Sequence, residues 1–161
     1  MSNRIPSCSE MLNLISLIEL SGVKLGSYKI HCAIDNKRSE WRPLEQYFCG
    51  TFDAGQSQQS QRNFECENIV SLINLSNSER WLYVGVYSVH GSVPAKGWNG
   101  FIYDLRRVSG LDHLDGRAIV QFSKSFRASY LVGKNFGSEL RICELRPENV
   151  SSKSNLLRQP S

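Results

Sequence analysis

Hydrophobic residues recur at helical spacing near the start of the chain and at strand spacing through most of the remainder. Between residues 11 and 20 the apolar positions suit one face of a helix. Ser9 is a suitable N-cap for this helix and Gly22 a suitable stop. Alternation over residues 28–34 then predicts a first strand, which ends at a polar Asp-Asn-Lys-Arg turn.

Most of the chain after residue 68 favours β-structure. Segments rich in β-branched and aromatic residues lie at 69–73, 81–89, 101–105, 118–122, 129–132 and 140–145. Turn residues separate the first two segments, and a loop containing Gly and Pro is expected over 90–100. We therefore expect an α+β, mainly β fold, in which a curved antiparallel sheet or small barrel follows an N-terminal helix. The closest general analogy is with PUA-like and B3-like domains.

The stretch between these regions is less regular. Pro43 suits the first turn of a short helix. The Gln-rich segment 56–61 is bounded by Phe52 and Phe64, so we expect an ordered loop or short helix there. Residues 1–147 are expected to form a single domain, and residues 148–161 a polar tail or linker.

The composition indicates a globular protein in the cytoplasm. The chain has 161 residues and a net charge of +4. It has no apolar run long enough to span a membrane and no signal-peptide pattern at the N-terminus. Its five cysteines are scattered without a CxxC pair, which favours buried, reduced thiols over disulfides or zinc ligands.

The positive charge is unevenly distributed. Residues 1–100 carry nine Lys/Arg and nine Asp/Glu, whereas residues 101–161 carry ten and six. An Arg-rich half is what a phosphate-contacting surface needs, although a solvated surface would have the same composition.

Motifs for catalysis are missing from the sequence. We find no Gly-rich phosphate loop, no GxSxG elbow and no HExxH pair. The sequence therefore predicts no catalytic residue, metal ligand or cofactor, and whether the protein is part of an enzyme stays open. Asp104, Asp112 and Asp115 lie near one another, but their spacing matches no nuclease motif.

Two polar segments suit contacts with DNA bases. The first is a Gln cluster followed by arginine, because Gln pairs bidentately with adenine and Arg with guanine; its candidates are Gln56, Gln59 and Arg62. The second is the loop around Trp98, whose indole could stack on a base. A polar helix face and an anchoring core tryptophan are the respective structural alternatives.

A third segment, residues 116–136, interleaves cations with aromatic rings. That pattern suits backbone contact combined with stacking on an exposed base, but a strand with buried rings and solvated charges would produce it too. The expected phosphate contacts are Arg117, Lys124, Arg127 and Lys134, and Tyr130 is the expected stacking ring.

The order of these segments over roughly residues 41–146 resembles a domain found in front of GIY-YIG-type nuclease domains in bacterial restriction-like endonucleases. The matching positions are Gln56, Gln59 and Phe64, then Val84, Gly85 and Tyr87, then Gly116 and Arg117, and finally Arg127 and Tyr130. Gly55 replaces the family's Tyr, Tyr130 replaces a Trp, and the chain contains no GIY…YIG pair. The resemblance thus implies the target-reading part without the nuclease.

The expected function is recognition of a specific or modified double-stranded DNA in bacterial defence, with a nuclease domain or subunit as partner. A modified base would be extruded into an aromatic-lined pocket. The alternatives are an endonuclease that uses carboxylates such as Asp104 and Asp115, an RNA-binding module, and a protein-interaction domain.

Overall fold

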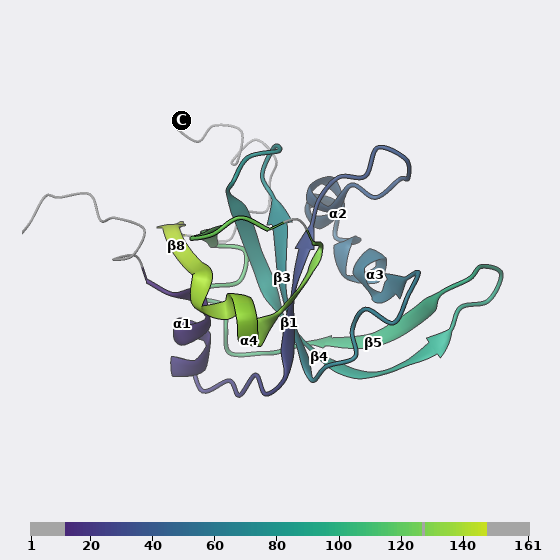
Figure 1. Cartoon of the computed structure of the whole chain (residues 1–161), viewed down its shortest axis with the longest axis horizontal. Helices are drawn as coiled ribbons and strands as arrows, with labels where there is room; N and C mark the ends of the chain where they lie inside the picture. Colours follow the sequence, from purple (N-terminus) through teal and green to yellow (C-terminus); the bar gives the residue numbers. More distant parts are fainter. Residues whose placement is uncertain (1–11, 127, 148–161) are drawn as a thin grey trace, which may run out of the picture.

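The fold is known from a computed structural model, which describes residues 12–126 and 128–147. Figure 1 shows a strongly curled sheet with short helices around it and a long hairpin projecting to one side. The elements in chain order are α1 (Leu14–Leu20), β1 (Tyr28–Ala33), α2 (Pro43–Cys49), α3 (Phe52–Ser57), β2 (Gln58–Gln59), β3 (Asn68–Asn74), β4 (Trp81–Pro94), β5 (Phe101–Arg107), β6 (Ala118–Phe122), β7 (Tyr130–Val132), α4 (Gly133–Phe136), η2 (Gly137–Glu139) and β8 (Leu140–Leu145).

The expectation of a mainly β fold with a curved sheet is confirmed, and the sheet is a strongly curled, mixed half-barrel. Its strand order is β2-β5-β4-β3-β1-β7, and β6 joins β4 to β8. The first residues of β4 pair with β6, whereas its second half pairs with β5. Because one long strand pairs with different strands along its length, the sheet bends into a half-barrel.

One strand pair is parallel, although the sequence pattern indicated an antiparallel sheet. Strand β1 runs parallel to β3 in register from Tyr28↔Asn68 to Ala33↔Ile73. A parallel pair needs a crossover connection, and the segment between these strands contains α2 and α3. The crossover therefore places both helices on one face of the sheet, beside the C-terminal half of β1 (Figure 1).

Alternate side chains of β1 point to opposite faces of the sheet. Ile30 and Cys32 pack in the largest core cluster, inside the curl with α1. Ala33 instead packs against the α2 and α3 side, in the cluster that contains Phe52. Strand β3 is buried along its whole length because both of its faces are covered.

The N-terminal helix begins later than the sequence pattern predicted. Its N-cap is Asn13, whose Oδ1 accepts a hydrogen bond from the Ser16 amide at 2.9 Å. The Asn13 Nδ2 also donates to the carbonyls of Gly137 and Leu140. This tertiary anchoring explains why Asn13 caps the helix; Ser9 lies outside the described residues. Gly22 follows the helix with φ 95°, as expected for a stop.

The predicted loop at 90–100 is shorter in the structure. Strand β4 continues to Pro94 and pairs with β5 across an irregularity between Val89 and Ser92, where Gly91 has φ 118°. The result is the projecting hairpin of Figure 1. Among the described residues no helix is long and apolar enough to cross a membrane.

The cysteines only partly follow the expectation of burial. Cys32 is buried, Cys66 and Cys143 are half-buried, and Cys49 is exposed at the end of α2. All four are free thiols, in line with the expectation of reduced cysteines. Cys8 lies outside the described residues.

Candidate nucleic-acid interface

Three of the residues predicted to contact bases meet at one pocket. Gln59 on β2, Trp98 at the tip of the β4–β5 hairpin and Tyr130 on β7 line a cavity of about 650 Å³. His31 and Trp41 complete its ring-bearing walls. We call this cavity the Trp41–Trp98 pocket. Its parts come from five separate segments of the chain, so only the tertiary structure brings them together.

Each tryptophan of the pocket lies against a glycine. A Cβ on Gly55 would stand 2.7 Å from Trp41 Cζ3, and a Cβ on Gly100 would overlap the Trp98 ring. Because glycine has no side chain, both indoles can lie close to the backbone at these two positions. Trp98 nevertheless keeps 43% of its surface exposed, so this ring is available to a ligand.

A buried polar network lies beneath the pocket. His31 is only 3% exposed, and its Nδ1 lies 2.7 Å from Oε1 of the fully buried Gln56. The same oxygen accepts a hydrogen bond from the Ser71 hydroxyl. Burial lowers the pKa of His31 to about 4, although its hydrogen bond with Gln56 opposes this shift. His31 is therefore neutral at pH 7.

The second part of the network consists of the hydrogen bonds and ring contacts of Tyr130. Its hydroxyl donates to Gln59 Oε1 at 2.5 Å, and this oxygen also accepts from Asn63 Nδ2 at 2.8 Å. The Tyr130 and His31 rings are stacked, with centroids 5.0 Å apart and planes within 1°. Phe64 contacts both rings edge-on at 5.4–5.6 Å. Burial raises the pKa of Tyr130, so its hydroxyl stays protonated and can donate.

Burial changes the roles of two predicted base contacts. Gln59 is only 5% exposed, its Oε1 accepts from Tyr130 and Asn63, and its Nε2 donates to the Gln56 carbonyl at 2.8 Å, so its amide is already paired within the protein. Gln56 is 0% exposed, so it supports His31 from beneath and cannot itself reach a base at the surface, contrary to the expectation from sequence. Arg62 remains at the surface, where its guanidinium lies 4.6 Å from the Phe101 ring centroid and 3.3 Å from Glu65. Its predicted base contact would require it to leave Glu65.

The predicted phosphate contacts do not form a single cluster. Arg117 precedes β6, and its Nε donates to the Arg146 carbonyl at 2.6 Å. Lys124 follows the C-terminal end of β6. Because a strand of five residues is roughly 17 Å long, Arg117 and Lys124 lie far apart at its two ends. Lys134 is exposed on α4. Arg127 lies outside the described residues.

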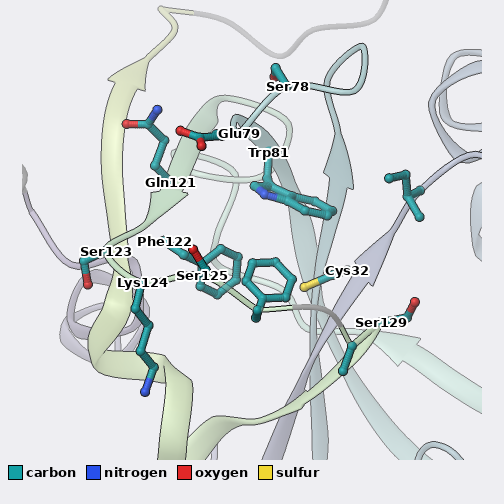
Figure 2. Close-up of a pocket in the computed structure, with 13 residues that line it drawn as sticks. Cys32, Ser78, Glu79, Trp81, Gln121, Phe122, Ser123, Lys124, Ser125 and Ser129 are labelled. Carbon is teal, nitrogen blue, oxygen red and sulfur yellow. The ribbon is translucent and has the colours of Figure 1, made fainter.

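A second pocket, of about 530 Å³, opens beside Lys124. Figure 2 shows the Trp81 indole and the Cys32 thiol at this cavity, with Glu79 and Gln121 at its upper edge. The ring centroids of Trp81 and Phe126 are 5.8 Å apart. Because these rings belong to the main core cluster, the second pocket is an opening into the half-barrel. Lys124 is its one predicted contact residue among those the structure describes.

The carboxylates considered for catalysis, Asp104 and Asp115, each form an ion pair with an arginine. Asp104 pairs with Arg106 at 2.9 Å on β5. The largely buried Asp115 lies 3.5 Å from Arg107, which also donates to the Val84 carbonyl at 2.5 Å. Within residues 12–126 and 128–147, no three His, Cys, Asp or Glu side chains come together as a metal site would require.

Sequence reasoning missed several residues of the pocket, among them its ring-bearing residues His31 and Trp41. In the sequence His31 is only one position of the predicted strand 28–34, and Trp41 lies in the irregular stretch that precedes Pro43. Their signal in the sequence is weak, because neither has a chemically related neighbour at a characteristic spacing. The partner of His31 is 25 residues away along the chain.

Comparison of the chain with family models, curated proteins and solved structures finds no match. The assignment of a function therefore depends on the residues and their geometry.

Proposed function

We propose that this chain is a DNA-binding recognition module of a bacterial restriction or defence system, which reads a specific or modified sequence. The observation that carries the proposal is the Trp41–Trp98 pocket. Gln59, Trp98 and Tyr130 were selected from sequence for contact with bases, and all three line this one cavity.

The pocket has the properties that an extruded base requires. Its volume of about 650 Å³ falls within the range of small-molecule sites, roughly 300–1,000 Å³, and its walls offer stacking surfaces. Extrusion of a base costs a few kcal/mol, and stacking on aromatic side chains recovers about 1–3 kcal/mol per base. The exposed Trp98 on the projecting hairpin is the ring best placed to make the first contact with DNA.

Phosphate contacts are assigned to the exposed lysines Lys124 and Lys134, with Arg117 and Arg127 as further candidates. The excess positive charge lies in the same half of the chain. Such contacts position the duplex without reading its sequence. Specificity would then come from the pocket.

The proposal is tested by fluorescence anisotropy with labelled duplex DNA, unmodified and cytosine-modified, over a salt series. We expect affinity to fall steeply with salt and to drop further in Lys124→Ala and Lys134→Ala. Trp98→Ala should weaken binding by roughly 5- to 150-fold, which corresponds to the loss of one stacked base.

Lys24→Ala is the matched control, since Lys24 is an exposed lysine before β1 that lines neither of these pockets. Binding that is weak and indifferent to salt and to these variants would refute the proposal. A preference for single-stranded RNA over duplex DNA would instead identify an RNA-binding module.

A further inference from the structure

We infer that the Trp41–Trp98 pocket prefers a nucleobase that carries a positive charge, such as a cytosine or adenine methylated on a ring nitrogen, over a neutral base of the same size. This inference rests on the proposed function, because it names the class of base that the module reads. It follows from the aromatic walls of the pocket and from the sign of the charge at its edge.

Two rings of the pocket have one face covered by another ring of the protein. Trp41 is stacked on Phe52, with centroids 5.7 Å apart and an angle of 25° between the planes. Tyr130 is stacked on His31 in the same way. Both Trp41 and Tyr130 line the cavity, so the face that a ligand can meet is the opposite one. The face of an aromatic ring carries partial negative charge and attracts cations.

The third ring is that of Trp98 at the tip of the β4–β5 hairpin. It is 43% exposed and lies against Gly100, whose lack of a side chain leaves room for the indole. Tryptophan is the aromatic side chain that attracts a cation most strongly. Three rings from separate segments therefore border one cavity, as in the aromatic cages that bind methylated cations.

The charge of the pocket lining is negative. Glu40 is the one charged side chain among the described residues that line the cavity, which include no Lys or Arg. His31 adds no positive charge at pH 7, since burial lowers its pKa to about 4. Glu40 is exposed at the edge of the cavity, where its carboxylate can pair with a cationic ligand and would repel an anionic one.

The loop that carries Glu40 and Trp41 is held by its own hydrogen bonds. The backbone amide of Asn36 donates to the Trp41 carbonyl at 3.1 Å. Arg42 Nη1 donates to the carbonyls of Ser39 and Trp41 at 2.9 Å each. The guanidinium of Arg42 is thus directed at backbone oxygens of the loop, and Arg42 does not line the cavity. The carboxylate and the indole are therefore positioned at the pocket without a ligand.

Hydrogen bonding by itself does not select a base in this pocket. The lining includes the amides of Asn36 and Gln58 and the hydroxyls of Ser39 and Ser60, and each of these groups can donate as well as accept. They can adapt to amino and keto bases alike. The charge of the ligand is different, because reorienting a neutral side chain does not change the sign of the charge that surrounds the cavity.

The size of the preference follows from the cation–π and ion-pair contributions. A cation on a partly desolvated ring is expected to bind roughly five- to thirtyfold more tightly than a neutral group of the same shape. The exposed Glu40 adds at most about fivefold, since water and salt screen a surface ion pair. Most of the expected preference therefore comes from the rings.

The test compares isomeric bases that differ in charge. 3-Methylcytosine is protonated at pH 7, whereas 5-methylcytosine has its methyl group on a carbon and is neutral. Each base is placed opposite an abasic site, so that extrusion costs little for either, and binding is measured by anisotropy at fixed salt. We expect the duplex with 3-methylcytosine to bind roughly fivefold more tightly or better.

Two exposed residues of the pocket can be substituted to locate the source of the preference. Glu40→Gln removes the carboxylate, and Trp98→Leu removes the ring face but keeps an apolar side chain. Each substitution should bring the affinity ratio of the two duplexes closer to one, and Trp98→Leu should have the larger effect. Glu79→Gln is the matched control, since Glu79 is an exposed glutamate at the second pocket, and it should leave the ratio unchanged.

The outcomes separate this inference from the proposed function. Tight, salt-sensitive binding with equal affinity for the two isomers would overturn the inference and leave the DNA-binding module standing. A trimethyllysine peptide that binds more tightly than the 3-methylcytosine duplex would also overturn it, because the preferred cation would then belong to a protein.

If no duplex binds, 3-methylcytidine and 5-methylcytidine are titrated while the indole N–H resonances of Trp41 and Trp98 are followed by NMR. Shifts with 3-methylcytidine alone would support the pocket's preference without the DNA function. No shift with either nucleoside would refute both the inference and the proposed function.

Discussion

Protonation of His31 should destabilise the protein at mildly acidic pH. The imidazole is 3% exposed, stacked on Tyr130 and bonded to Gln56. A charged ring in this position would lose its hydration without gaining a carboxylate partner. The pKa of His31 is therefore lowered from 6.5 to about 4, which means that folding favours the neutral form.

The size of the effect follows from this pKa difference. The folded pKa lies below the unfolded one, so the stabilisation is fully present above pH 6.5 and is lost as the pH falls towards 4. The difference between a pKa of 6.5 in the unfolded chain and about 4 in the folded protein corresponds to about 3 kcal/mol of unfolding free energy. That is a large fraction of the 5–15 kcal/mol typical of a domain.

Urea unfolding of the wild-type protein and of His31→Asn between pH 7.5 and 4 measures this contribution. The variant lacks the titrating ring, and all other ionisable groups are common to both proteins. Wild type should lose its stability advantage over the variant by about 3 kcal/mol as the pH falls. An advantage that is constant with pH, or an NMR titration of the His31 ring near pH 6.5, would refute the reasoning.

Three further substitutions test the packing around the pocket and the sheet. Phe64→Ala should cost about 3–5 kcal/mol in urea unfolding, because this ring is fully buried; a loss below 1 kcal/mol would contradict that. Gly100→Ala should displace the Trp98 indole, which its Cβ would overlap, and weaken duplex binding as much as Trp98→Ala; its melting temperature should also fall, because the same Cβ would stand 2.7 Å from the backbone carbonyl oxygen of Gln59. Gly85→Ala should cost about 1–3 kcal/mol, since Gly85 has φ +154° and its Cβ would overlap the Arg107 guanidinium; unchanged thermal unfolding would argue against this contact.

Several features of the fold are encoded locally and could be predicted from the sequence. The strand pattern gave the positions of β1, β3, β5, β6, β7 and β8 to within about two residues, because alternation reports which side chains face the core. Pro43 begins α2, as its fixed φ favours. The curled, mainly β architecture follows from many short strands separated by turns.

The candidate site was predictable only in part. Gln59, Trp98 and Tyr130 could be selected by chemical type, but nothing in the sequence shows that they share a cavity. Their convergence depends on the β1–β3 crossover and on the length of the β4–β5 hairpin. His31 was missed for the same reason, since its hydrogen-bond partner comes from α3.

The sequence by itself determined where most of the strands lie, that α2 begins at Pro43 and where the positive charge is concentrated. The tertiary structure alone decided the parallel β1–β3 pair, the Asn13 cap and the burial of Gln56. The physical reason is that secondary structure follows from interactions between near neighbours in the chain. Whether a polar side chain is a buried support or a surface contact depends on distant segments that cover it and satisfy its hydrogen bonds.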